Sequence, residues 1–356
     1  MDSVRELFDH YAIGEKDLIV TNEYILAPHL DGKELKCHVL YQEQYGKGEP
    51  SDEMIDGMLG AIRNKDIDRI FAIGGGTVID VSKLFVFGGE HTCEELYDHG
   101  KDLPKQRQLI IIPTTCGTGS EMTGLTIAEI KKKHTKLGLA LPQLYADETV
   151  LVDEFLQTIP YNVFATSSID ALIHAIESFV SNKRSLYSDM FAEKAIRMII
   201  AGYKHITENG RDSVKDCVHD ILIASDLAGV AFSNAGCGAV HATSYPVGAN
   251  FHVPHGLANY IMFTACFKAY AKNGADMTDV EAVLREVLGV DGDPWAALTL
   301  LLDKILERKP LKEVGMTEAN IREFAKTVLA TQGRLLGNMP VELSEDDLAE
   351  IYTECF

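Results

Sequence analysis

The sequence predicts an α/β domain with a parallel, Rossmann-like sheet, followed by an all-α domain. Three observations lead to this fold class. Short apolar strands alternate with helical patterns through the first part of the chain, which indicates a parallel sheet with crossover helices. Two of these strands run directly into loops rich in glycine and hydroxyl groups. After Ile159-Pro160 the strands cease and long helical stripes follow. We therefore expect one domain over residues 1–155 and a second over residues 156–356.

Five strands are expected in the first domain, over residues 17–22, 34–41, 68–73, 109–112 and 150–153. A helix begins after the second strand, with Ser51 as its N-cap. The apolar residues that follow recur at helical spacing, namely Met54, Met58, Leu59 and Ile62. Residues 123–139 are expected to form a hairpin, and its run of lysines, Lys131 to Lys133, to form a solvated turn.

A triple glycine follows the third strand, in Gly74-Gly75-Gly76-Thr77, and a helix opens at Val78. Glycine lets a backbone approach a phosphate closely, and the free N–H groups of a helix N-terminus favour negative charge. The run is not G-x-G-x-x-G, because residue 79 is isoleucine, so a tight turn with no ligand is the alternative. The position between a strand and a helix favours an anion site.

A second loop, residues 114–121, follows the fourth strand and is dense in threonine, serine and glycine. It is a candidate cradle for a phosphate or a ribose. The alternative is a helix-capping loop with Ser120 or Thr118 as the N-cap. Both loops follow the carboxyl ends of strands, where α/β sheets bind their ligands. The first domain is therefore a candidate platform for a cofactor.

Seven helices are expected in the second domain, over residues 162–182, 186–208, 212–235, 256–273, 277–288, 294–307 and 317–334. The first carries Asp170, His174 and Glu177 at positions i, i+4 and i+7, which places the three side chains on one face. Three further histidines lie in a later segment bracketed by glycine, and these are His241, His252 and His255.

These six side chains offer enough carboxylate and imidazole donors for a divalent metal such as zinc or iron, with positions left open for water or substrate. The rest of the first helix is mostly apolar, so we expect it to be buried, and a buried carboxylate needs a cation or several hydrogen bonds. A histidine alone is more often a satisfied core residue than a ligand. Spacing alone does not choose four ligands from the six.

Composition limits the functions that remain. A net charge of −20 over 356 residues repels phosphate backbones, so nucleic acid is not an expected partner. Seven cysteines without a Cys-x-x-Cys pair are expected to be reduced thiols. The start of the sequence does not resemble a signal peptide, and no apolar run reaches transmembrane length. We expect a cytoplasmic protein with no membrane partner.

Four motifs resemble those of the iron-containing (group III) alcohol dehydrogenase family, at residues 74–83, 113–121, 170–177 and 241–256. They occur in the family's order across most of the chain, which is more specific than any one of them. The resemblance implies the dehydroquinate synthase-like architecture of that family, with a site in the cleft between the two domains. It also implies NAD, with NADP not excluded, and a divalent metal, Fe²⁺ or alternatively Zn²⁺. The metal ligands that it implies are Asp170, His174, His241 and His255.

The same resemblance implies a set of cofactor-binding residues, namely Asn22, Gly74, Gly75, Gly76, Thr77, Asp80, Lys83, Thr114, Thr115, Thr118, Ser120, Lys136 and Leu156. Two positions depart from the family. Where the family often has a second histidine, four residues after the first of the last motif, this chain has Tyr245. The proton is therefore expected to be carried by Tyr245, His252 or water. After the first strand the family often has an acidic residue that favours NAD, and the neutral Asn22 here leaves the choice between NAD and NADP open.

The activity that this resemblance implies is hydride transfer between a primary alcohol and NAD(P). The chain as a whole looks most like members of the family that interconvert 4-hydroxybutyrate and succinate semialdehyde with NAD(H). Such a substrate needs a cation for its carboxylate, and Lys183 and Arg184 are candidates, with a surface position as their alternative. A butanol-type dehydrogenase, a dehydroquinate-synthase-like lyase and a nucleotide sensor with a vestigial site are the other functions considered. The expected partners are a small alcohol or aldehyde and a second copy of the chain in a homodimer.

Overall fold

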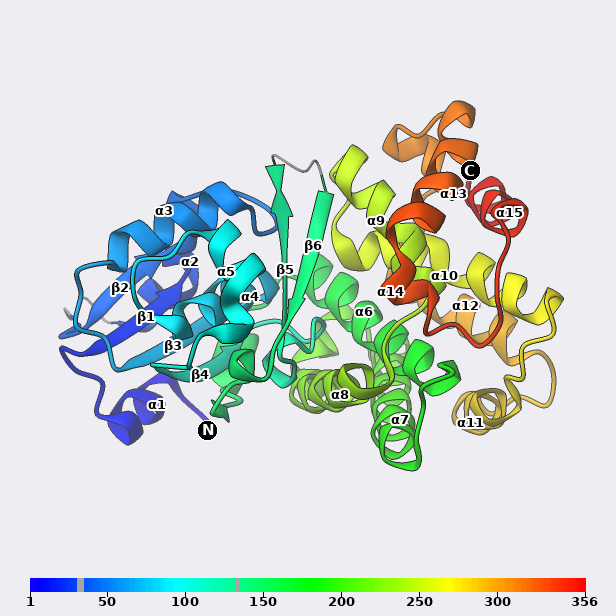
Figure 1. Cartoon of the computed structure of the whole chain (residues 1–356). Helices are drawn as coiled ribbons and strands as arrows, with labels where there is room; N and C mark the ends of the chain where they lie inside the picture. The colour runs from blue at the N-terminus through cyan, green and yellow to red at the C-terminus, as the bar shows by residue number, and fades with distance from the viewer. Residues whose placement is uncertain (31–34, 132–134) are drawn as a thin grey trace. The chain divides into compact units, whose positions relative to one another are not determined.

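The computed structural model describes residues 1–30, 35–131 and 135–356 (Figure 1). The chain divides into two compact units, Met1–Ile159 and Pro160–Phe356. The first holds a parallel sheet and the second is helical, so the predicted fold class is confirmed. Parts of the expected second strand and of the lysine turn, Glu34, Lys132 and Lys133, lie outside the described residues.

The first unit is built on a five-stranded sheet in the order β2-β1-β3-β4-β7, with every neighbouring pair parallel. Its strands are β1 (Asp17–Thr21), β2 (His38–Tyr41), β3 (Arg69–Gly74), β4 (Gln108–Pro113) and β7 (Glu148–Thr149). The predicted hairpin is confirmed as an antiparallel pair, β5 (Leu125–Ile130) and β6 (Thr135–Ala140). The helices of this unit are α1 (Val4–Tyr11), α2 (Glu23–Leu26), α3 (Asp52–Ile62), α4 (Gly76–Leu84) and α5 (Cys93–His99).

Both faces of this sheet are covered, which explains why its strands are nearly continuous apolar runs. Leu18 and Val20 of β1 join one core cluster with residues of α3, α4 and α5. Ile19 lies between them in sequence and joins the cluster on the opposite face, with residues of α1 and α2. The predicted cap of α3 is confirmed, because the Ser51 hydroxyl accepts a hydrogen bond from the backbone N–H of Met54 at 3.3 Å.

The last strand is shorter and earlier than expected. β7 pairs with β4 through only two residues, so the prediction of a strand over residues 150–153 is wrong. The N–H of Val150 still donates to the carbonyl of Ile111 in β4 at 2.9 Å, but beyond it the backbone bonds the start of the chain. The amino group of Met1 donates to the carbonyl of Leu151 at 2.8 Å, and the N–H of Asp153 donates to the carbonyl of Met1 at 3.3 Å. A short apolar run that looks like a strand is here a connection whose later residues are bonded from outside the sheet.

The second unit consists of helices α6 (Tyr161–Val180), α7 (Leu186–Asn209), α8 (Val214–Ala235), α9 (Ala239–Phe251), α10 (His255–Lys272), α11 (Thr278–Leu288), α12 (Pro294–Ile305), α13 (Glu318–Thr331), α14 (Gly333–Leu336) and α15 (Glu345–Cys355). Helix α6 lies among the other helices of this unit (Figure 1) and contacts α7, α8 and α10. Most of its side chains are buried. Helix α9 is not among the predicted helices, because Pro246 lies inside it and obscures the helical pattern.

Within the described residues, α6 alone is long and apolar enough to cross a membrane, and 83% of its most apolar window is buried inside the protein. The segments Arg211–Ala235 and Ala239–Phe251 meet the same criterion only together, and they are bent by 105° from one another. The core helices of ordinary globular units also meet this criterion.

Candidate functional site

Helix α6 presents Asp170, His174 and Glu177 on one face, as their spacing predicts. All three are almost completely buried, and Asp170 is only 2% exposed. The His174 ring stacks between two other rings, at 4.3 Å from Phe232 and 4.6 Å from His241. A carboxylate and an imidazole are thus held in fixed positions inside an apolar helix bundle.

Two more helices bring the remaining donors to α6. His241 lies in the first turn of α9, and His255 is the first residue of α10. The next residue, Gly256, lies directly against α6, since a Cβ atom on it would come within 2.1 Å of the Thr166 carbonyl oxygen. The absence of a side chain at this position therefore permits the approach that places His255 beside Asp170.

The four-donor cluster consists of Asp170, His174, His241 and His255, and its ligand atoms all lie within 4.8 Å of one another. The Nε2 atoms of His174 and His241 are 2.9 Å apart. One carboxylate oxygen of Asp170 lies 3.8 Å from Nε2 of His241 and 3.8 Å from Nε2 of His255. A tetrahedral ion with bonds of about 2.0–2.2 Å needs donors about 3–4 Å apart, so these residues fit a divalent metal. The His255 side chain is 35% exposed, which leaves one side of the cluster open to solvent.

Glu177 is not at the centre of this cluster. One of its carboxylate oxygens lies 2.5 Å from Nδ1 of His241, and the other accepts hydrogen bonds from the backbone N–H groups of Gly238 at 3.1 Å and Val240 at 2.8 Å. A carboxylate on Nδ1 keeps the proton on that atom and directs the lone pair of Nε2 at the metal position. The structure therefore gives Glu177 an orienting role where spacing left it as a competing ligand.

Asn259 is the residue at this site that sequence reasoning missed. It is fully buried, and its amide nitrogen lies 2.7 Å from Asp170, 3.1 Å from His241 and 3.2 Å from His255. Its carbonyl oxygen has no hydrogen-bond partner among the described residues. Because it lies four residues after His255, on the same face of α10, its spacing was a usable signal.

The ionisation of the cluster follows from burial and from its own charges. Burial disfavours the charged form of the Asp170 carboxyl, but the three imidazoles outweigh that effect and lower the pKa of Asp170 below its ordinary value. Burial also works against an imidazolium at His241, but Cys237 and Glu177 raise the pKa of His241 well above its ordinary value. The charged form of Asp170 is thus stabilised by the imidazoles, and that of His241 by Cys237 and Glu177.

The two proton-carrying candidates differ in position. Tyr245 is half-buried on α9, and its ring centre lies 6.0 Å from that of His255. His252 ends α9 in the left-handed region, at φ 53°, and is exposed. It is not one of the residues whose donor atoms gather at the cluster. Tyr245 therefore lies beside the metal position and His252 lies apart from it.

The cations considered for a substrate carboxylate lie after the end of α6. The guanidinium of Arg184 is paired with Asp189 at 2.8 Å and with Asp279 at 2.9 Å, and it stacks over the Phe179 ring. Lys183 is exposed. The Arg184 guanidinium thus joins the segment after α6 to α7 and α11. These contacts favour a structural surface role over binding of a substrate carboxylate.

The two glycine-rich loops of the first unit pack on each other. β3 ends at Gly74, and α4 begins at Gly76 with Gly75 as its N-cap. A Cβ atom on Gly76 would lie 2.9 Å from the Thr118 methyl group, and one on Gly75 would lie 3.3 Å from that of Thr115. The glycines therefore let the second loop approach the N-terminus of α4, and the free N–H groups there are a candidate anion site.

Asp80 and Lys83 were expected at the cofactor, but their polar atoms are used inside the first unit. The ammonium of Lys83 has no exposed surface, and it donates to the Ser120 hydroxyl at 2.6 Å, the Thr123 hydroxyl at 3.0 Å and the Leu125 carbonyl at 2.6 Å. The Ser120 hydroxyl in turn donates to Asp80 at 2.5 Å. Asp80 and Lys83 thus hold the second loop and β5 against α4.

The other expected cofactor residues differ in accessibility. The hydroxyl of Thr77 donates to the Gly48 carbonyl at 3.0 Å, Lys136 is paired with Glu49, and Leu156 is buried. Thr114 and Asn22 are also mostly buried. With the strand order observed, residues 22, 74–77 and 114–120 follow the carboxyl ends of three adjacent strands.

Known proteins resemble this chain over both units. Residues 2–154 match the family model described as iron-containing alcohol dehydrogenase, and residues 164–356 match that of the C-terminal part of the Fe-containing alcohol dehydrogenase family. The chain is 44% identical to the 4-hydroxybutyrate dehydrogenase of Clostridium kluyveri, over 100% of this chain and 96% of that protein. It is 31% identical to the NADPH-dependent butanol dehydrogenase of Clostridium saccharobutylicum, over 86% and 81% of the two chains. Its fold matches that of sulfoacetaldehyde reductase from Bifidobacterium kashiwanohense in complex with NAD⁺, with a TM-score of 0.84 and 23% identity over 99% and 93% of the chains.

Proposed function

The chain belongs to the iron-containing alcohol dehydrogenase family, and we propose that it interconverts 4-hydroxybutyrate and succinate semialdehyde with NAD(H). The observation that carries the redox activity is the four-donor cluster, because one carboxylate and three imidazoles converge in a buried setting that is open on one side. The assignment of the substrate rests on the similarity to the Clostridium kluyveri enzyme over the full length of this chain. A butanol-type substrate is the second candidate, since a butanol dehydrogenase is also similar.

Asp170, His174, His241 and His255 would hold the metal, with Fe²⁺ as the first candidate and Zn²⁺ as the second. When bound, the ion supplies Lewis acidity to the alcohol or aldehyde oxygen, and the nicotinamide accepts or donates the hydride. Glu177 keeps the proton on Nδ1 of His241. Tyr245 is half-buried and its ring lies beside that of His255, so its hydroxyl is the proposed group that holds or moves the alcohol proton, and the exposed His252 is less suited.

The nucleotide is assigned to the first unit. The N-terminus of α4, with the glycines before it, would bind the diphosphate, and Thr77, Thr115 and Thr118 lie on the loops that flank it. Asp80 and Lys83 support these loops from inside. The binding of NAD rather than NADP is part of this proposal.

The proposed substrate is tested by turnover of a metal-loaded preparation. The purified chain is loaded with Fe²⁺ or Zn²⁺, and NADH oxidation is followed by absorbance with succinate semialdehyde, butanal and acetaldehyde as alternative substrates. A clear preference for succinate semialdehyde supports the hydroxyacid assignment. Equal rates with the three aldehydes would instead identify a general primary-alcohol dehydrogenase.

A first prediction concerns His255. Because His255 donates to the cluster and lies outside the nucleotide loops, His255→Ala should lose bound metal and turnover while NADH binding stays nearly unchanged. Metal content after desalting and NADH fluorescence measure the two effects. His252→Ala is the matched control, since that histidine is exposed and lies outside the cluster. Loss of metal and NADH binding together in His255→Ala would mean that the histidine is structural.

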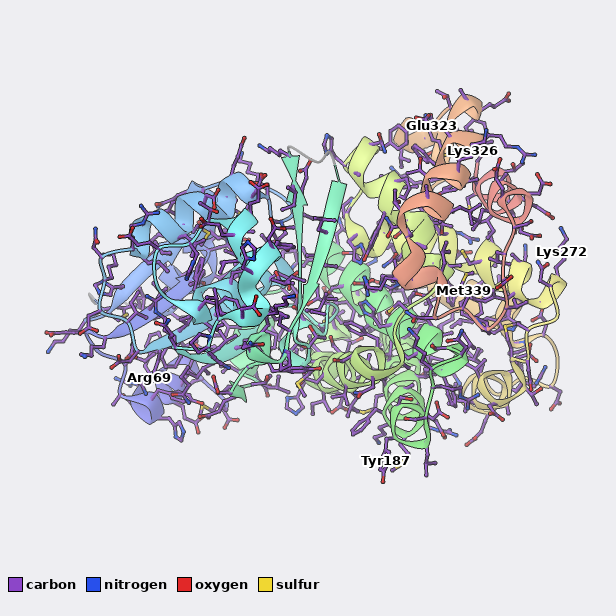
Figure 2. All side chains as sticks on the ribbon, in the orientation of Figure 1. Arg69, Tyr187, Lys272, Glu323, Lys326 and Met339 are labelled. Carbon is purple, nitrogen blue, oxygen red and sulfur yellow. The ribbon has the colours of Figure 1, made fainter. Side chains whose placement is uncertain are left out.

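The remaining expectations are a homodimer in the cytoplasm that binds neither nucleic acid nor membrane, and we propose these as well. Exposed apolar side chains gather at the start of α7, where Leu186 is 74%, Tyr187 75% and Met190 61% exposed. Tyr187 projects outward from this helix (Figure 2). Such a patch is characteristic of a protein–protein contact. Light scattering on the eluted protein measures the mass, and a monomer at working concentration would contradict the dimer.

A further inference from the structure

The residue that follows β1 in this chain uses its side chain to hold an acid from the segment after the neighbouring strand, β2. Asn22 is only 6% exposed. Its amide nitrogen donates to the carboxylate of Glu43 at 2.8 Å and to the side-chain carbonyl of Gln42 at 3.1 Å. A negative charge that is missing at position 22 is therefore present 2.8 Å away, on the second residue after β2.

Glu43 is held from two directions. One carboxylate oxygen accepts from Asn22, and the other accepts from the backbone N–H of Glu23 at 2.7 Å, at the start of α2. Each oxygen keeps a further lone pair, and the residue is only partly buried. Among the residues that the structure describes, no lysine, arginine or histidine nitrogen lies within 4.0 Å of this carboxylate, so its charge is not paired.

The strand order places this carboxylate on the edge that carries the glycine loops. β2, β1 and β3 are adjacent and parallel, and neighbouring strands lie about 4.8 Å apart, so the carboxyl ends of β2 and β3 are separated by about 10 Å. The segment after β2 also reaches the glycine loop, through the hydrogen bond from Thr77 to the carbonyl of Gly48 at 3.0 Å. In dinucleotide sites, the diphosphate lies at the glycine turn and an acid on the same edge binds the adenosine ribose.

We propose that Glu43, oriented by Asn22, is the residue that selects NAD(H) over NADP(H). Its carboxylate accepts hydrogen bonds from the ribose hydroxyls of NAD(H), and its unpaired charge repels the 2′-phosphate of NADP(H). This inference rests on the proposed function, because it concerns the nucleotide site of that dehydrogenase. In this assignment Glu43, from the segment after β2, supplies the acid that the neutral Asn22 after β1 lacks. The two residues are not neighbours in the sequence, so the sequence alone does not connect them.

The test compares equilibrium binding of NADH and NADPH, by nucleotide fluorescence, in the full-length chain and its Glu43→Gln variant. The unmodified chain should bind NADH at least about 100-fold more tightly than NADPH. Glu43→Gln should weaken NADH binding by about tenfold and strengthen NADPH binding by about tenfold, as expected for one hydrogen bond to a charged group and one removed repulsion. Asn22→Ala should weaken NADH binding without strengthening NADPH binding, because the charge remains.

Glu23→Gln is the matched control, since it removes one charge from the exposed side chain of the neighbouring helix start. It should change the NADH to NADPH ratio by no more than about twofold. Circular dichroism melts show whether each variant is folded. An unmodified chain that prefers NADPH, an unchanged ratio in Glu43→Gln, or an equal change in Glu23→Gln would overturn the assignment. If the unmodified chain binds neither nucleotide, the proposed function itself fails and this inference fails with it.

Discussion

Replacing Glu177 by glutamine tests how the protein prepares its metal position. The carboxylate joins Nδ1 of His241 on one oxygen and two backbone N–H groups on the other. A glutamine whose carbonyl keeps the backbone N–H groups must direct its amide N–H at Nδ1 of His241. The imidazole proton then moves to Nε2, the atom that lies 2.9 Å from Nε2 of His174. A metal has to displace that proton before His241 can bind it.

Loss of such a carboxylate partner weakens metal binding by about 10–100-fold, which is about 1.4–2.7 kcal/mol. The alternative amide orientation leaves two buried N–H groups without an acceptor, at about 1–3 kcal/mol each, so both orientations are unfavourable. Competition with a chromophoric chelator for Zn²⁺ measures the dissociation constant. Glu208→Gln is the control, because it removes an equal charge at the exposed end of α7. A folded Glu177→Gln protein with metal affinity within about twofold of the unmodified chain would refute the orienting role.

Three further predictions concern pH and packing. Because the pKa of His241 is raised in the metal-free protein, a metal must compete with a proton for this imidazole. The apparent metal affinity should therefore increase as pH rises through neutrality. Calorimetric titration with the metal at several pH values measures this change. The backbone N–H of Val4 bonds Glu154 at 2.7 Å and lowers the pKa of that carboxyl. The Glu154 carboxylate thus stabilises the fold above its unfolded pKa of about 4.3, and this stabilisation is lost as pH falls through its lower, folded pKa. Thermal melts of Glu154→Gln should therefore differ from those of the unmodified chain at pH 7 and converge with them in acid. Gly256→Ala places a methyl group 2.1 Å from the Thr166 carbonyl oxygen. It should lower the free energy of unfolding by about 1–3 kcal/mol, measured by denaturant titration, and weaken metal binding, measured by chelator competition. A variant as stable as the unmodified chain would contradict the close packing.

Local rules predicted much of the fold. The strands of the sheet core and the cap at Ser51 follow from apolar runs and from one hydroxyl before a helical stripe. The grouping of Asp170 with His174 follows from a spacing of four on a helix. These features depend on residues close together in the chain, so the sequence carries them directly.

Features that depend on distant residues were not accessible in the same way. Glu177 faces Nδ1 of His241, and only the packing of α9 on α6 determines which ring nitrogen it meets. Lys83 lies in a motif beside a glycine loop, but its neighbours come from residues 120–125, which bury it completely. Residues 150–152 form an apolar run that resembles a strand, but the backbone groups of Leu151 and Asp153 bond Met1 instead of a neighbouring strand.

All four donor atoms of the cluster belong to the unit Pro160–Phe356, whereas the glycine loops belong to Met1–Ile159. A ligand that binds only the folded form stabilises the part of the protein that forms its site, by RT ln(1 + [L]/Kd). On the proposed assignment, the metal and the nucleotide would therefore stabilise different units of the chain. Metal would protect the helical unit against local opening and proteolysis, nucleotide would protect the sheet unit, and removing one of them would expose only one unit.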